Sequence, residues 1–256
     1  MKKISVCMAS YNGERYIAAQ LDTILKQLRP FDEVVISDDC STDSTLEIIR
    51  SFGDDRIRIV ASPGYRNPIF NFENAMSASV GDIIVLADQD DVWLDNRIKQ
   101  ILDSFDGEER RPFTLVLDSK IVDGGLVPTC ASLFDYLNAG QGVLKNFVRN
   151  TYVGCHMAFS RDLIEIALPF PKRIPMHDVW LGLVGELFGT VCFVHKQTML
   201  FRRHGSNSTK LAYPFIQKIR WRFWLSVSLA AVCWRHRCEL RRGYLCRHSP
   251  IQGDIA

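Results

Sequence analysis

The sequence lacks a long apolar run, a secretory leader, paired cysteine motifs and a strong net charge. Its longest hydrophobic stretch, residues 224–234, is well short of the roughly 20 residues that a membrane-spanning helix needs. Residues 4–9 are too few for a signal-peptide core, so we expect a cytoplasmic protein. The eight cysteines form no C-x-x-C pair, which predicts reduced thiols. A net charge of +2 gives no general reason to expect nucleic-acid binding.

Short β-rich segments alternate with helical patterns through the first half of the chain. Strands are predicted at residues 4–9, 33–39, 56–61 and 82–88, with helices at 15–28, 41–52 and about 70–79. This alternation is typical of an α/β fold with a parallel sheet. Further along we predict a helix at 96–105, strand-turn-strand at 113–127, a strand at 152–160, a helix at 177–189 and two strands within 190–205.

Three carboxylates, Asp88, Asp90 and Asp91, follow the fourth predicted strand. Open α/β sheets bind their ligands at the carboxyl ends of the strands, and clustered carboxylates repel one another unless a cation or hydrogen-bond donors hold them. Their oxygens suit Mg²⁺ or Mn²⁺, which complete their shells with water and substrate phosphate. The loop therefore predicts a divalent metal and a phosphate-bearing substrate, with an ordinary solvated loop as the alternative.

A second acidic segment, with Asp38 and Asp39, follows the strand at 33–39. A carboxylate in this position can accept hydrogen bonds from a nucleotide base or a ribose. Asp43 and Ser44 come later and are residue types that cap helices. Ser44 and Glu47 also have the spacing of a capping box.

Three segments in order, SVCMASYNGERYIAAQLDTIL, EVVISDDCSTDSTLEII and DIIVLADQDDVWLDNRI, resemble the family 2 glycosyltransferases with a GT-A fold. The resemblance is close over about the first 105 residues and continues more loosely to about 208, through GCHMAF, HDVWLG and FRRHGSN. It implies a Rossmann-like, mostly parallel central sheet flanked by helices. The catalytic domain would cover residues 1–208, with a nucleotide-sugar half at 1–120, an acceptor half at 121–208 and a helical tail at 209–256.

The resemblance also implies roles for the residues of the donor site. Asp39 would bind the base, and Asp38 would shape that loop. Asp90 would be the main ligand of the metal, Mn²⁺ or Mg²⁺, while Asp88 would contact ribose or the metal. Asp91 either belongs to this site or caps the next helix. The wall of the nucleotide pocket would be formed by Ser10, Tyr11 and Asn12.

On the acceptor side, Asp178 matches the family's base, which takes a proton from the attacking hydroxyl in a single inverting displacement. The alternative is a helix N-cap. A cationic turn matches the element that binds the leaving diphosphate, although it can also be a solvated corner; its members are Arg202, Arg203 and His204. Three further side chains either face a sugar or pack in the core, and we favour packing for each: Trp93, His156 and Trp180.

The segment beyond about residue 210 is basic and rich in aromatic residues. Its cations are Lys218, Arg220, Arg222, Arg235, Arg237, Arg241, Arg242 and Arg247, interleaved with Trp221, Phe223, Trp224, Leu225 and Trp234. A helix of this composition, too short to span a bilayer, lies in the interface of an anionic membrane or packs on the catalytic domain. Nothing in it resembles a nucleic-acid-binding module.

We therefore expect a metal-dependent, inverting hexosyltransferase of O-antigen or related polysaccharide assembly. Its donor would be a nucleotide diphosphate sugar, UDP-glucose or UDP-galactose first and dTDP-rhamnose as the alternative. Its acceptor would be a polyprenyl-diphosphate-linked glycan, met by a peripheral enzyme at the inner face of the bacterial cytoplasmic membrane. Two other classes remain as alternatives: a non-catalytic nucleotide- or carbohydrate-binding module, and a haloacid-dehalogenase-like phosphatase with Asp88 as its nucleophile.

Overall fold

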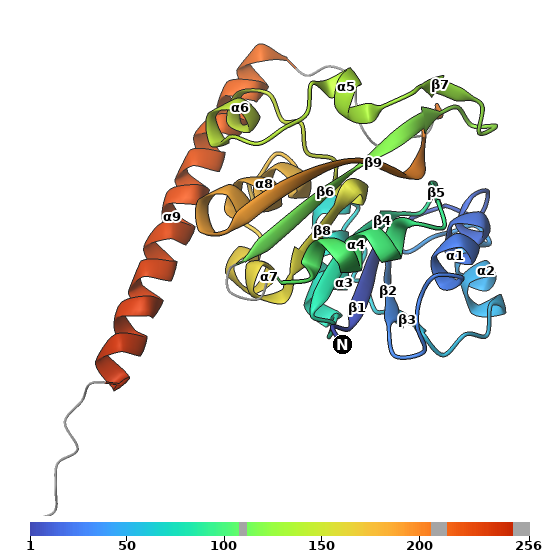
Figure 1. The fold of residues 1–256 in the computed structure, drawn as a ribbon, viewed down its shortest axis with the longest axis horizontal. Coiled ribbons are helices and arrows are strands. Elements are labelled where there is room, and N and C mark those ends of the chain that lie inside the picture. The colour runs from blue at the N-terminus through green and yellow to red at the C-terminus, as the bar shows by residue number, and fades with distance from the viewer. Residues whose placement is uncertain (108–111, 206–213, 248–256) are drawn as a thin grey trace, which may run out of the picture.

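The fold is built around one mixed sheet (Figure 1). A computed structural model of the chain describes residues 1–107, 112–205 and 214–247, without the side chains of residues 215 and 238–247. In this part of the chain the strand order is β3-β2-β1-β4-β8-β6-β9-β5, with β7 beside β6. The strands are β1 (Ile4–Ser10), β2 (Glu33–Asp38), β3 (Ile57–Val60), β4 (Ile83–Asp88), β5 (Val92–Trp93), β6 (Phe113–Val122), β7 (Pro128–Cys130), β8 (Met157–Ser160) and β9 (Thr190–Arg202).

The predicted parallel half of the sheet is confirmed. β3, β2, β1 and β4 are parallel neighbours, and the helices between them supply the crossover connections that parallel strands need. β8 then pairs antiparallel with both β4 and β6. β9 is parallel to β6 and antiparallel to the short β5. The sheet thus begins as the expected nucleotide-binding arrangement and becomes mixed in its second half.

Helices cover both faces of the sheet, because neighbouring residues of each strand point to opposite sides. Along β1, Val6 and Met8 contribute to one core and Cys7 contributes to the other. The first core includes α1 (Ile17–Leu25), α2 (Thr45–Ser51) and α4 (Arg97–Phe105). The second includes α3 (Pro68–Ala78), α5 (Leu133–Leu137), α6 (Val143–Val148), α7 (Arg161–Ala167), α8 (His177–Phe188) and α9 (Phe215–Arg247).

Three local predictions were wrong. Residues 190–202 form one strand, not two, because shifts of register between Leu117 and Lys120 of β6 accommodate the polar centre of β9 without a turn. The strand predicted at 152–160 begins only at Met157, after a 3₁₀ turn, η1 (Gly154–His156). The capping box does not form, since the Ser44 side chain makes no cap hydrogen bond. Asp43 accepts the Thr45 N–H at 3.0 Å in its place.

The helix α9 runs along one edge of the molecule, beside α7 and α8 (Figure 1). Leu225, Leu229 and Val232 are buried in the second core, so α9 packs on the domain, as one of the two alternatives for this segment expects. A second apolar stripe on the opposite side of the helix is exposed: Ile216, Ile219, Phe223, Val227 and Trp234. Ile216 is 80% exposed and Trp234 is 72% exposed.

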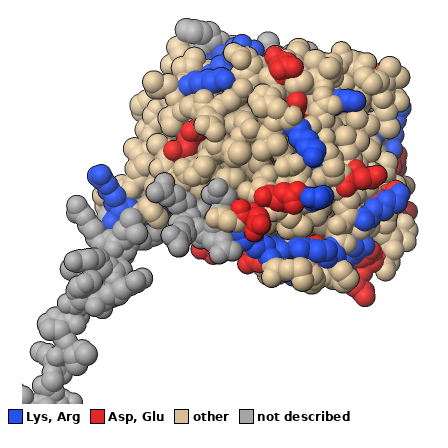
Figure 2. Space-filling model, in the orientation of Figure 1, with Lys and Arg blue, Asp and Glu red and all other residues tan. Residues whose placement is uncertain are grey.

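None of the helices among the described residues combines the length and the apolar character needed to cross a membrane. On the face drawn in Figure 2, acidic and basic side chains are intermingled along one band and most of the remaining surface is uncharged. The boundary expected at residue 208 falls in the segment 206–213, outside the residues that the structure describes.

Candidate active site

The candidate site lies where β1, β2 and β4 end. Ser10 pairs with Asp38, and Ala9 pairs with Asp88, so three distant segments of sequence meet at one edge of the sheet. The loops that follow these strands carry the polar residues singled out in the sequence. This is the edge at which open α/β sheets bind ligands.

In the loop after β2, Asp38 is buried and saturated with local hydrogen bonds. It accepts from the Ser10 hydroxyl at 2.7 Å and from both the backbone N–H and the hydroxyl of Ser41, at 2.8 and 2.7 Å. Asp39 is also buried but is held more loosely, by the Asn67 N–H at 3.2 Å and the Ser62 hydroxyl at 3.4 Å. Asp38 therefore shapes the loop, and Asp39 retains more capacity to accept bonds from a ligand.

The loop after β1 is fixed by the side chain of Gln89, which the sequence did not single out. Its amide oxygen accepts the Tyr11 N–H at 2.9 Å, and its amide nitrogen donates to the Tyr11 carbonyl at 3.0 Å. Asn12 adopts a left-handed conformation with φ 46°, and its side chain accepts the Thr42 N–H at 2.8 Å. The Tyr11 ring remains 54% exposed, available to a ligand at this edge.

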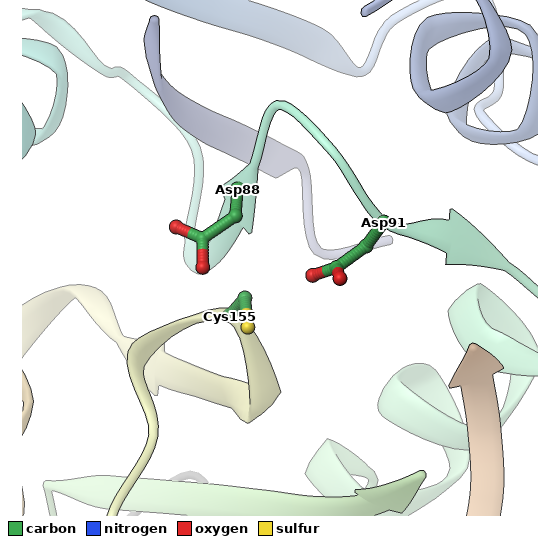
Figure 3. Close-up of side chains that lie close together, drawn as sticks. All are labelled: Asp88, Asp91 and Cys155. Carbon is green, nitrogen blue, oxygen red and sulfur yellow. The ribbon is translucent and has the colours of Figure 1, made fainter. Parts of the chain in front are cut away.

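The acidic loop after β4 turns two carboxylates toward the thiol of Cys155 (Figure 3). One ligand atom from each of Asp88, Asp91 and Cys155 lies within 4.8 Å of the others. Burial, followed by the charge of Asp90, raises the pKa of Asp88 to about 7. Burial also raises the pKa of Asp91 well above its usual range. Removing water from like charges favours protonated carboxyls in the metal-free protein.

Asp91 belongs to this cluster and does not cap the next helix. The N-cap of α4 is Asn96, while Asp91 is fully buried and its Oδ1 accepts the Arg202 N–H at 2.9 Å. Its other oxygen, Oδ2, is buried without a hydrogen-bond partner among the described residues. The capping alternative was therefore wrong.

The cationic turn after β9 meets the acidic loop directly. His204 Nε2 and Asp90 Oδ2 are 2.8 Å apart. The Arg202 guanidinium donates to the carbonyls of Asp90 and Gly124 at 2.7 and 2.8 Å and lies 4.6 Å from the Tyr16 ring centroid. The charge of Arg203 opposes the rise in the pKa of Asp88. This turn is therefore part of the site, which rules out the solvated-corner alternative.

Asp178 lies in the first turn of α8, whose N-cap is Met176, so the N-cap alternative was wrong. Burial raises the pKa of Asp178 to about 7, against the lowering effect of hydrogen bonds from the Val179 N–H and the Asn150 side chain. The charge of Asp88 raises it further. A carboxylate with this pKa is matched to accept a proton near neutral pH.

Three residues for which we favoured packing are buried, as predicted. The His156 ring contacts the Ser119 hydroxyl at 2.7 Å, and burial lowers its pKa well below the usual range. Trp93 is buried under the Arg97 guanidinium, 4.8 Å from the ring centroid. Trp180 donates from its indole to the Ala167 carbonyl at 3.0 Å.

Two members of the site gave no recognisable sequence signal. Arg97 is fully buried and donates to the Thr198 hydroxyl at 2.8 Å and to the Cys155 carbonyl at 2.6 Å. Burial lowers the pKa of Arg97 to about 10, while the charge of Asp91 opposes this. Burial also raises the pKa of the Cys155 thiol, so it stays protonated. Both residues reach the site through tertiary contacts alone.

This fold and edge are of the class that binds nucleotide ligands at the carboxyl ends of a parallel sheet. Residues 5–166 match the family described as Glycosyl transferase family 2. The chain belongs to this family of glycosyltransferases.

Two relatives illustrate the range of the similarity. The dTDP-rhamnosyl transferase RfbG of Shigella flexneri is 35% identical over 227 residues, covering 83% of this chain and 77% of that protein. The UDP-Glc:alpha-D-GlcNAc-diphosphoundecaprenol beta-1,3-glucosyltransferase WfgD of Escherichia coli is 30% identical over 96 residues, or 38% of each chain.

Solved structures share the GT-A fold. S. aureus TarS in complex with UDP-GlcNAc superimposes with a TM-score of 0.67 at 20% identity, over 83% of this chain and 62% of that one. The mannosyltransferase PcManGT of Pyrobaculum calidifontis, in complex with GDP-Man and Mn²⁺, gives a TM-score of 0.59 at 20% identity, over 78% of this chain and 56% of that one. The predicted fold class is thus confirmed.

Proposed function

We propose that this glycosyltransferase moves a hexose from a nucleotide diphosphate sugar to a hydroxyl of a lipid-linked glycan, in one inverting, metal-assisted displacement. The observation that carries the proposal is the position of the start of α8. His177, next to Asp178, lies so close to Gly154 that a Cβ there would meet its Nε2 at 2.4 Å, and the adjacent Cys155 faces Asp88 and Asp91. The helix that carries the proposed base therefore begins beside the strand-end carboxylates. A binding module without catalysis requires no such base.

The carboxylates of the acidic loop fit a hard divalent cation. Asp88 and Asp91 converge, and the buried Oδ2 of Asp91 has no partner among the described residues; Asp90 lies beside them, bonded to His204. The protonated, soft thiol of Cys155 fits Mg²⁺ or Mn²⁺ poorly, so we assign it no ligand role. When bound, the metal would neutralise negative charge on the departing diphosphate. The Mn²⁺ named with PcManGT supports this assignment.

Residues of the chain itself act as the base, bind the leaving diphosphate and position the acidic loop. Asp178 takes the proton from the acceptor hydroxyl as that oxygen attacks the anomeric carbon. Arg203, whose charge acts on Asp88, donates to the diphosphate oxygens as they leave. Arg202 already holds the carbonyls of Asp90 and Gly124, so its role is to fix the turn. His204 orients Asp90.

The loops after β1 and β2 bind the base and the ribose of the donor nucleotide. Tyr11 offers an exposed ring, and Asp39 offers carboxylate oxygens to the base. Ser10 and Asn12 keep both loops in place through their bonds to Asp38 and to the Thr42 N–H. UDP-glucose or UDP-galactose is our first choice of donor, supported by the name of WfgD. dTDP-rhamnose is the second candidate, favoured by the wider similarity to RfbG.

The acceptor and location complete the proposal. WfgD is named for a diphosphoundecaprenol-linked acceptor, which supports a polyprenyl-diphosphate-linked glycan here. The exposed apolar stripe of α9, flanked by the exposed cation Arg220, supports peripheral contact with an anionic membrane at the inner face of the cytoplasmic membrane.

A donor panel tests the whole proposal. The full chain is incubated with UDP-glucose, UDP-galactose and dTDP-rhamnose, Mn²⁺ and a synthetic GlcNAc-diphosphate-lipid, and the product is analysed by mass and by NMR of the new anomeric centre. We expect one product with inverted configuration, lost with EDTA and in Asp90→Ala. Donor binding without transfer across the panel would indicate a binding module. Hydrolysis of p-nitrophenyl phosphate would favour the phosphatase alternative.

A further inference from the structure

A basic hollow lies between the segment that precedes α8 and the first turns of α9. We call it the Arg173 hollow, and its volume is about 530 Å³. It is lined by Lys172, Arg173, Ile174, Arg220, Trp221 and Trp224. A second hollow of about 350 Å³ shares Lys172, Arg173 and Trp224 with it. α9 forms one wall of both hollows, at the edge of the molecule seen in Figure 1.

The charge of the Arg173 hollow is of one sign. Lys172, Arg173 and Arg220 line it, and no carboxylate does. The ion pairs formed between described residues involve none of these three cations. The Arg173 guanidinium is held 4.0 Å from the centroid of the Trp224 ring, which fixes it at the wall. Cations gathered in a concave surface without acidic partners attract an anion.

The position of the hollow relates it to the acceptor side of the site. Ile174 lies four residues before Asp178 in the same segment. Trp180, two residues after Asp178, lines the adjoining hollow. The acidic loop and the cationic turn after β9 contribute no residue to either lining. The Arg173 hollow is therefore a cationic hollow separate from the acidic loop, lined in part by the segment that leads into α8, the helix of Asp178.

We propose that the Arg173 hollow binds the diphosphate group of the lipid-linked acceptor, an inference that rests on the function proposed above. Arg173 and Arg220 bind the phosphate oxygens, and Lys172 adds a third positive charge. The indoles of Trp221 and Trp224 give apolar walls for the carbons that adjoin the diphosphate. The lipid end of the acceptor is then held on the segment that leads into α8, by a group that takes no part in the reaction.

Direct binding tests the site independently of transfer. The full chain is titrated in EDTA with the synthetic GlcNAc-diphosphate-lipid, and with GlcNAc on the same lipid through a neutral linker. We expect Arg173→Gln with Arg220→Gln to weaken binding of the diphosphate ligand by about tenfold or more and to leave the neutral ligand unaffected. The matched double control is Lys218→Gln with Lys196→Gln, two exposed lysines outside both hollows, which should bind as wild type does.

The controls separate this proposal from the proposed function. If no donor supports transfer but the variant still loses diphosphate binding, the site stands and the proposed reaction fails. Equal binding by wild type and variant, or equal loss for the neutral ligand, overturns the site. Loss confined to vesicles of anionic phospholipid, with acceptor binding in detergent unchanged, also overturns it, because the hollow would then bind membrane headgroups. Arg220→Glu, at an exposed position, repeats the test should Arg173→Gln fail to fold.

Discussion

The role proposed for Asp178 depends on one property, a carboxyl pKa raised to about 7 mainly by burial. Below that pH it is protonated and cannot accept the hydroxyl proton, so kcat/KM should rise with pH through about 7, by about tenfold between pH 6 and pH 8. Asp178→Asn should lower kcat by roughly 10²–10⁴-fold while donor affinity is retained. Steady-state release of the nucleotide across pH and calorimetric titration with the donor measure the two effects.

Asp162 provides a matched control for this prediction. It is the second residue of α7 and accepts the next backbone N–H, from Leu163, at 3.0 Å, as Asp178 does from Val179 at 2.5 Å in α8. Asp162→Asn should leave both kcat and the pH profile within about twofold of wild type. A fall matching that of Asp178→Asn would mean that the helix terminus, rather than the base, matters.

We expect the acidic cluster to link the stability of the protein to pH and to metal. Because the folded-state pKa of Asp88 is raised to about 7 from 3.8, its contribution to stability is present at low pH and is lost as pH rises through about 7. Without metal, Asp88→Asn should therefore unfold at a higher temperature than wild type. The gain should be larger at pH 8 than at pH 5, at about 2–4 °C for each kcal/mol.

At pH 8, Mn²⁺ should raise the unfolding temperature of wild type more than that of Asp88→Asn. Wild type should then unfold at the higher temperature of the two. Differential scanning fluorimetry with and without EDTA reads both effects. Asp103→Asn, at an exposed ion pair with Lys99, is the control and should respond to Mn²⁺ as wild type does. An equal metal response in wild type and Asp88→Asn would contradict a role for Asp88 in the metal site.

At the scale of elements, the loops after β1 and β4 are joined by the Gln89 amide, which makes two hydrogen bonds to Tyr11. The same side chain lies so close over Gly13 that a Cβ there would meet it at 2.4 Å. Gln89→Ala should raise the donor KM by about tenfold, since two hydrogen bonds of roughly 0.5–1.5 kcal/mol each are lost. Initial-rate kinetics measure it. Gln100→Ala, whose amide donates to Ser104 in the same helix, should leave the donor KM unchanged.

We predict that the exposed apolar stripe of α9 contributes to binding of anionic vesicles. Phe223→Ser with Trp234→Ser removes two large apolar side chains from the surface and should weaken binding to phosphatidylglycerol vesicles by about tenfold or more. Co-sedimentation measures the change. Tyr136→Ser with Leu144→Ser, at 68% and 80% exposed positions on α5 and α6, is the control. A similar loss in both double variants would argue against α9 as the contact.

Sequence patterns predicted the first four strands and the helices between them, because local periodicity and strand-end polarity determine those elements. They failed where tertiary contacts decide the outcome. β9 stays one strand because of its register with β6, and η1 interrupts the strand expected at 152–160. Motifs singled out Asp88 and Asp178 as candidate site residues, and their roles stay predictions. Arg97 and Cys155 were missed because an arginine in a helix and a cysteine in a strand-like segment are ordinary residues until the chain folds.

At the scale of the molecule, α9 should unfold together with the catalytic domain. Leu225 is 2% exposed within the second core, so Leu225→Ala should lower the free energy of unfolding by about 2–5 kcal/mol. Ile216→Ala, on the exposed stripe, should cost less than about 0.5 kcal/mol. Urea unfolding followed by fluorescence and by circular dichroism should give one coincident transition for wild type. Two separate transitions would contradict the assignment of α9 to the core.

Arg97 has a consequence for recombining this chain with its relatives. From α4 it donates to the Thr198 hydroxyl in β9 and to the Cys155 carbonyl in η1. One buried side chain therefore connects the N-terminal part of the chain to its later part through hydrogen bonds. A chimera joined after residue 105 therefore inherits the arginine from one parent and both of its acceptors from the other. We expect the chimera to fold only if one parent supplies the arginine and the other supplies both acceptors in the same positions.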